Sequence, residues 1–182
     1  MEKQITTKEI FNGNVLKIRL DEVELDDGRK GEREVVHHPG GAAILVVKDG
    51  KVLLERQYRY AVGKEVIEIP AGKRDKGEDF LQTATRELEE ETGLRATKIE
   101  KLCEIIPSPG YTDEIIGIFY ADEFVSGHTH FDETEELTSF WVDLDEAYSM
   151  IDRGEITDAK TLVALLKYKS FRSFMFHREV SE

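Results

Sequence analysis

Three glutamates and an arginine occur close together near the middle of the chain, as Arg86, Glu87, Glu90 and Glu91. In a helix, Glu87 and Glu91 lie one turn apart and Glu90 lies just around the helix, so three carboxylates share one edge. Like charges at this spacing oppose a helix by about 0.2 to 0.5 kcal/mol per pair, and Arg86 offsets only part of the repulsion. We therefore expect divalent cations to balance the remaining negative charge.

The chemistry of this helix edge follows from its oxygen ligands. Carboxylates suit hard ions, and Mg2+ in proteins typically takes a few carboxylates together with water and phosphate oxygens, with Mn2+ as a plausible substitute. The pattern is thus typical of metal-assisted phosphate chemistry. A glutamate-rich helix can equally be a solvated surface, and the segment alone does not separate the two interpretations.

The elements that must position these side chains follow from local patterns. Residues 79–92 are predicted to form the helix, because Asp79 and Gln82 are spaced as a capping box and Gly93 is a typical stop. Strands are expected over residues 42–47, 52–54, 66–69, 98–106, 115–124 and 137–142, with helices over 144–153 and 160–171. Strands flanked by helices predict an α/β sandwich.

The N-terminal part of the sequence has the pattern of strands and turns, without a predicted helix. Residues 6–25 and 33–37 have strand character, broken by turn signals at 12–14 and 26–28. We expect a small β-unit over residues 1–39, followed by a domain over residues 40–182.

Composition excludes several classes of function. A formal net charge of -13 and a pI near 4.9 argue against a nonspecific nucleic-acid binder, because phosphate backbones are gripped by clustered Lys and Arg. The longest apolar run, residues 42–47, is too short to span a bilayer. A single cysteine, Cys103, allows no internal disulfide, and the first residues are charged. We expect a cytoplasmic protein without nucleic-acid or membrane partners.

A longer motif surrounds the carboxylate helix. Gly72 is followed by Glu78 and then by Arg-Glu-Leu-Glu-Glu-Glu-Thr-Gly-Leu at residues 86–94. This resembles the Nudix hydrolase signature at every defined position, which is far more specific than a lone glycine motif. The resemblance implies an αβα sandwich with a mixed central sheet, in which the signature binds divalent metal and a substrate diphosphate. It makes Glu87, Glu90 and Glu91 candidate metal ligands.

Segments outside the signature resemble the ADP-ribose pyrophosphatase branch of this family, at residues 57–59, 68–72 and 108–114, with Pro109 fifteen residues past Leu94. The resemblance extends from about residue 34 to 166. It implies Mg2+-dependent hydrolysis of ADP-ribose to AMP and ribose 5-phosphate, with two or three ions.

Further roles are implied by the same resemblance. The backbone carbonyl of Ala71 and the side chain of Glu135 complete the metal ligands, and Glu133 activates water, although Glu133, Glu135 and Glu136 are not firmly separated. Arg86 is expected to orient Glu90 through a salt bridge.

Candidate substrate contacts lie in three segments. Arg56 and Arg59 could meet phosphate or stack on adenine, and Glu68 could accept a hydrogen bond from the base or ribose. The resemblance favours Arg59 of the two arginines.

The resemblance also assigns residues to the far end of the substrate and to a partner subunit. It places Ser108, Gly110 and Glu114 at the terminal ribose, and Glu34 at the site of a partner subunit. The N-terminal strands are expected to exchange in a homodimer, with residues 12–37 packing on the mate.

Two alternatives remain open. Another Nudix substrate, such as a sugar nucleotide, a dinucleoside polyphosphate or NADH, would use the same diphosphate chemistry. A noncatalytic module that senses ADP-ribose is the alternative of another class. The intact acidic residues of the signature count against the sensor.

Overall fold

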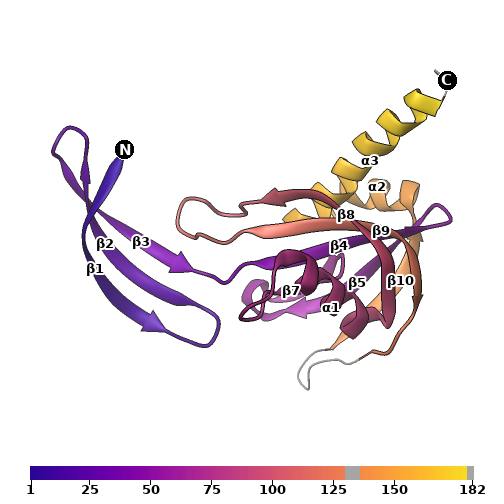
Figure 1. Cartoon of the computed structure of the whole chain (residues 1–182), viewed down its shortest axis with the longest axis horizontal. Helices are drawn as coiled ribbons and strands as arrows, with labels where there is room; N and C mark the ends of the chain where they lie inside the picture. The colour runs from indigo at the N-terminus through magenta and orange to yellow at the C-terminus, as the bar shows by residue number, and fades with distance from the viewer. Residues whose placement is uncertain (130–135, 180–182) are drawn as a thin grey trace. The chain divides into compact units, whose positions relative to one another are not determined.

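A computed structural model describes residues 1–129 and 136–179, and it divides into two compact units (Figure 1). The N-terminal unit comprises Met1–Gly40 together with Ile106–Ile115. The main unit comprises Gly41–Ile105 and Ile116–Glu182. Among the described residues, no helix is both long and apolar enough to cross a membrane.

The N-terminal unit is a three-stranded antiparallel sheet of β1 (Glu2–Asn12), β2 (Lys17–Leu25) and β3 (Lys30–His37) in that order. The loop 106–115 attaches to β3 through backbone hydrogen bonds, since Val36 N donates to Tyr111 O at 2.7 Å and Asp113 N donates to Val36 O at 3.2 Å. This loop was not expected to belong with the strands, because nothing in its local sequence indicates a partner so far away along the chain.

The main unit is built on a seven-stranded sheet. Its strands are β4 (Gly41–Lys48), β5 (Lys51–Arg59), β6 (Lys64–Glu68), β7 (Ala71–Lys73), β8 (Leu94–Ile105), β9 (Ile116–Ser126) and β10 (Leu137–Asp143). The path runs β10-β5-β4-β9-β8, with β6 paired to β5 and β7 paired to β4. Only the β4 and β9 pair is parallel among these, so the sheet is mixed.

Helices cover both faces of this sheet (Figure 1). α1 (Phe80–Thr92) packs Ala84 and Leu88 on one face, whereas α2 (Leu144–Asp152) and α3 (Ala159–Glu179) pack on the other. Strand β4 is buried on both sides, as a central strand between two helical layers must be. The layers confirm the predicted αβα sandwich.

The bounds of α1 follow from its sequence. The Asp79 side chain accepts a hydrogen bond from Gln82 N, and the Gln82 side chain accepts one from Asp79 N, each at 2.8 Å, so the expected capping box is present. Gly93 ends the helix in the left-handed conformation at φ 68°. These caps fix the rotation of the helix, and hence the direction of its carboxylates.

Two short elements were not expected. β7 is only three residues long, and a 3-10 helix η1 (Tyr60–Val62) follows β5. Segments this short carry no periodicity from which they could be predicted.

Candidate active site

Glu91 and Ala71 meet where the end of α1 crosses β7. Glu91 is only 4% exposed, and its Oε2 accepts a hydrogen bond from the backbone N of Ala71 at 2.9 Å. The next residue, Gly72, lies against Glu87, since a Cβ at Gly72 would be 2.0 Å from the Glu87 Oε1. A side chain at residue 72 would therefore displace the Glu87 carboxylate, and two of the predicted carboxylates are brought against the strand that carries Ala71.

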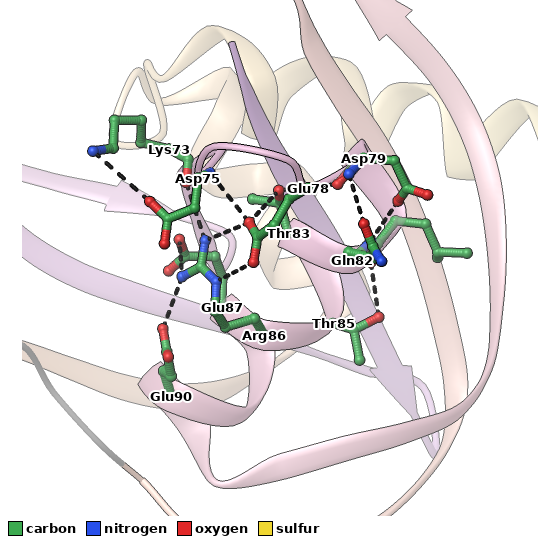
Figure 2. A network of polar contacts seen from close by, with 11 residues as sticks. Lys73, Asp75, Glu78, Asp79, Gln82, Thr83, Thr85, Arg86, Glu87 and Glu90 are labelled. Carbon is green, nitrogen blue, oxygen red and sulfur yellow. Dashed lines mark hydrogen bonds and ion pairs between the residues drawn. The ribbon is translucent and has the colours of Figure 1, made fainter. Parts of the chain in front are cut away.

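Arg86 hydrogen-bonds to three carboxylates of the signature, those of Glu78, Glu87 and Glu90 (Figure 2). Its Nε and Nη2 donate to the two oxygens of Glu78 at 2.9 and 3.0 Å, and Nη1 donates to Glu87 at 2.7 Å and to Glu90 at 2.9 Å. Nη2 also donates to the backbone carbonyl of Lys73 at 3.1 Å. The predicted pairing with Glu90 is present, but it is one contact among several.

This arrangement sets the charge of the network. The hydrogen bonds from Arg86 lower the pKa of Glu78 to about 2, and the surrounding carboxylates raise the pKa of Arg86 above its usual value. Arg86 thus remains cationic, and it offsets the repulsion between Glu87 and Glu90 that the sequence predicts.

A further carboxylate, Glu55 on β5, lies beside Glu91. Glu55 is 4% exposed, and it hydrogen-bonds to Glu91 and accepts from Ser139 Oγ at 3.2 Å. Burial raises the pKa of Glu55 to about 7, and the charge of neighbouring Glu68 acts in the same direction. An acidic residue in an otherwise apolar run, residues 52–55, was a signal in the sequence that we did not use.

Arg59 and Glu68 form a bidentate ion pair between β5 and β6. Arg59 Nε and Nη2 donate to the two oxygens of Glu68 at 2.7 and 2.8 Å, and Lys160 also binds Glu68. Burial raises the pKa of Glu68, but the two cations outweigh it and the pKa is lowered. Both oxygens of Glu68 are therefore occupied by protein groups, and the residue is only 4% exposed.

Arg56 and Arg59 lie on opposite faces of β5. Successive residues of a strand alternate between faces, and the pairing of β5 with β6 runs from Glu55 to Arg59 without a bulge. Arg59 therefore shares the face of Glu55, whereas Arg56 lies over the Phe140 ring at 5.6 Å. The structure does not bring the two arginines to one point.

The predicted substrate residues Ser108, Gly110, Glu114 and Glu34 all belong to the N-terminal unit. Gly110 and Glu34 line a cavity of about 690 Å3 in that unit. Ser108 and Glu114 are not among its lining residues; the Ser108 carbonyl accepts from Tyr111 N at 3.3 Å, and Glu114 pairs with His38 at 3.2 Å.

Glu133, predicted to activate water, and Glu135, predicted to bind metal, lie outside the described residues. Within residues 1–129 and 136–179, no three side chains of His, Cys, Asp or Glu converge as a metal-binding group. The Ala71 carbonyl and the carboxylates of Glu87 and Glu91 would supply only oxygen ligands, and this is the ligand type that a hard cation takes.

Comparison with known proteins identifies the family of this chain. Residues 36–165 match the NUDIX domain, and residues 2–36 match the nucleoside diphosphate sugar hydrolase N-terminal domain. The chain is 41% identical over 167 residues to the ADP-ribose pyrophosphatase of Bacillus subtilis (strain 168), with 90% of each sequence covered. It is 40% identical over 183 residues to the methanol dehydrogenase activator of Bacillus methanolicus, with 97% of each covered.

The fold also matches a crystal structure of an ADP compounds hydrolase with a TM-score of 0.84, over 96% of this chain and 95% of that chain. The two share 19% identity, so this likeness supports the fold alone.

Proposed function

The chain belongs to the Nudix hydrolase family, whose domain spans residues 36–165, and we propose that it hydrolyses the pyrophosphate bond of ADP-ribose to AMP and ribose 5-phosphate. The proposal is supported by the identity of 41% to a protein named ADP-ribose pyrophosphatase, which it covers to 90%.

The observation that carries the proposal is the contact between Glu91 and Ala71. It joins a buried carboxylate at the end of α1 to the strand whose backbone carbonyl the resemblance assigns to metal. Gly72 lets the carboxylate of Glu87 approach the same strand. Two carboxylates of the helix thereby lie against the strand that carries the Ala71 carbonyl.

We assign this meeting point of α1 and β7 to Mg2+, with two or three ions and Mn2+ as a substitute. Bound there, the cation would neutralise negative charge on the diphosphate and its transition state. The residues proposed to hold it are Ala71, Glu87, Glu90, Glu91 and Glu135.

The side chains of the protein have separate tasks in this proposal. Arg86 holds Glu87 and Glu90 in fixed directions through hydrogen bonds of 2.7 and 2.9 Å. Glu133 accepts the proton of the attacking water. Glu133→Gln should bind substrate nearly normally and lose most of kcat; a loss of binding alone would reject the assignment and favour Glu135 or Glu136.

Arg59 is our candidate for binding a phosphate oxygen, because its side chain is 41% exposed and Glu68 holds its guanidinium along one edge. Arg56 is a weaker candidate, since it faces the opposite side of β5. A direct contact from Glu68 to the base or ribose would require one of its oxygens to be released. Contacts to the terminal ribose are assigned to Ser108, Gly110 and Glu114.

We further propose a cytoplasmic homodimer in which the N-terminal unit packs on a second copy, with Glu34 reaching the partner's site. Support comes from β1, whose residues are all exposed, including Ile10 at 55% and Phe11 at 54%. Sedimentation or light scattering at micromolar concentration measures the mass. A fully active monomer would contradict the dimer.

A second candidate function rests on the relative from Bacillus methanolicus, which the chain matches over 97% of both lengths. Adding the protein to a methanol dehydrogenase and recording alcohol oxidation tests this function. Because 40% identity is close to the 41% to the pyrophosphatase, this assay belongs beside the hydrolysis assay.

The proposed reaction is tested with a panel of ADP-ribose, sugar nucleotides, dinucleoside polyphosphates and NADH, with Mg2+ or with EDTA. We expect AMP and ribose 5-phosphate from ADP-ribose, at the highest kcat/KM of the panel and only with the metal. Preferred cleavage of another compound would replace the substrate. Binding of ADP-ribose without AMP formation would establish a sensor instead.

A further inference from the structure

A closed circuit of polar contacts joins β5, β6 and the start of α3. Glu68 accepts from Arg59 at 2.7 and 2.8 Å and from Lys160, and Lys160 lies 3.1 Å from Asp158 Oδ2. Lys160 is 11% exposed, although lysine is seldom buried. The four groups carry two positive and two negative charges, so the circuit is balanced.

The same contacts continue through the first residues of α3 and back to Ile69, which follows Glu68 in the chain. Asp158 accepts from the N and Oγ1 of Thr161 at 3.0 and 2.7 Å, which caps the start of α3. Thr161 Oγ1 in turn accepts from Ile69 N at 2.9 Å, directly beside Glu68. These contacts fix the position of Lys160 relative to β6, whose last residue, Glu68, it neutralises.

Arg59 is the member of this circuit that reaches solvent. Its Nε and Nη2 are taken by Glu68, whereas Nη1 has no hydrogen-bond partner among the residues that the structure describes. The side chain of Arg59 is 41% exposed, while the side chain of Glu68 is 6% exposed. Arg59 is thus partly exposed, and a buried carboxylate holds it along one edge of its guanidinium.

We propose that Lys160 is a positioning residue for substrate binding, which holds Glu68 so that Arg59 keeps its direction toward an anionic group of the substrate. The inference rests on the proposed function, because it takes Arg59 as the phosphate contact. Lys160 itself touches no substrate in this proposal. Nothing in the sequence singled it out, because a lysine in the first turn of a helix normally lies in solvent.

Removing Lys160 has two separable consequences. Glu68 and Asp158 are left with one cation between them, which destabilises the fold whatever the function is. Glu68 also loses one of its two supports, so Arg59 gains freedom and binds the anion less well. The first effect is one of charge, and a second substitution that restores the balance should cancel it. The second effect is one of geometry and should persist.

The test compares Lys160→Met with the double variant Lys160→Met/Asp158→Asn, in which Arg59 and Glu68 remain as a balanced pair and Asn still caps the helix. Thermal unfolding, kcat, KM and the Kd of ADP-ribose measured with EDTA are recorded for each. We expect KM and Kd to rise about tenfold or more in both variants, with kcat within about threefold of the parent. We expect the double variant to recover the unfolding temperature of the parent.

Lys167→Met, on the exposed side of α3, is the matched control and should leave all four quantities unchanged. Unchanged KM and Kd in the double variant would overturn the inference and leave Lys160 a purely structural role. If the parent prefers another substrate of the panel, that compound replaces ADP-ribose. If ADP-ribose is not the substrate, the parent enzyme shows it. If Lys160 does not position Arg59, only the variants show it.

Discussion

The backbone N of Ala71 donates a hydrogen bond of 2.9 Å to Oε2 of Glu91, and this contact fixes the end of α1 to β7. Twenty residues separate the two along the chain. The capping box at Asp79 and Leu88 at 0% exposure hold the helix in the rotation that makes the contact possible. A change at Glu91 should therefore act on the chemistry more than on the fold.

Glu91→Gln should lower kcat for ADP-ribose with Mg2+ by about a hundredfold or more, because one charged oxygen is lost from the proposed cation site. The amide oxygen can still accept from Ala71 N, so circular dichroism should be unchanged. Glu89→Gln is the matched control, since Glu89 lies on the same helix but pairs with Arg95. Turnover of Glu91→Gln within a few fold of the parent would refute the metal assignment.

Arg86→Lys should lower the free energy of unfolding by about 1.5 to 3 kcal/mol, because a single ammonium cannot replace the guanidinium contacts to Glu78, Glu87 and Glu90. It should also lower kcat, since Glu87 and Glu90 lose their fixed directions. Urea unfolding and steady-state kinetics measure the two effects. Arg95→Lys, at an exposed pair, should change neither; equal behaviour of the two variants would contradict the role of Arg86.

The pKa of Glu78, lowered to about 2 by the hydrogen bonds from Arg86, predicts a loss of stability in acid. A lowered carboxyl pKa stabilises the fold above the unfolded value of 4.5, and this contribution disappears as the pH falls from 4.5 through 2. Glu78→Gln should flatten this part of the curve of unfolding free energy against pH. Glu123→Gln, exposed on β9, should keep the slope of the parent.

The buried carboxyl group of Glu55 predicts the opposite dependence of the unfolding free energy on pH. Its pKa is raised to about 7 by burial, so its contribution is fully present below 4.5 and is lost as the pH rises through 7. In EDTA, Glu55→Gln should gain stability relative to the parent between pH 5 and pH 8, because the neutral amide has no charge to bury. A difference between variant and parent that stays constant over this range would show that Glu55 does not titrate there.

Much of the fold could be predicted because its signals are local. The capping box and Gly93 defined α1, and the buried run of β4 indicated a central strand. β7 was missed because three residues carry no pattern, and the loop 106–115 was missed because its contact with β3 joins segments far apart in the chain.

The site was predictable only in part. The spacing of Glu87, Glu90 and Glu91 indicated a shared helix edge, but not that Glu78 is a main partner of Arg86, since that contact depends on a loop. Arg56 and Arg59 lie on opposite faces because β5 extends to Arg59, beyond the strand predicted at residues 52–54. The contact of Lys160 with Glu68 could not be predicted, because it depends on the packing of α3 against β6, which no local sequence pattern shows.

The central claim is that Ala71 and Glu91 hold a divalent cation against a pyrophosphate. A crystal structure with Mg2+ and a nonhydrolysable methylene analogue of ADP-ribose tests this most directly. We predict an ion about 2.0 to 2.1 Å from a Glu91 oxygen and the Ala71 carbonyl, and in contact with the diphosphate. A fully occupied analogue without an ion at this point would contradict the account.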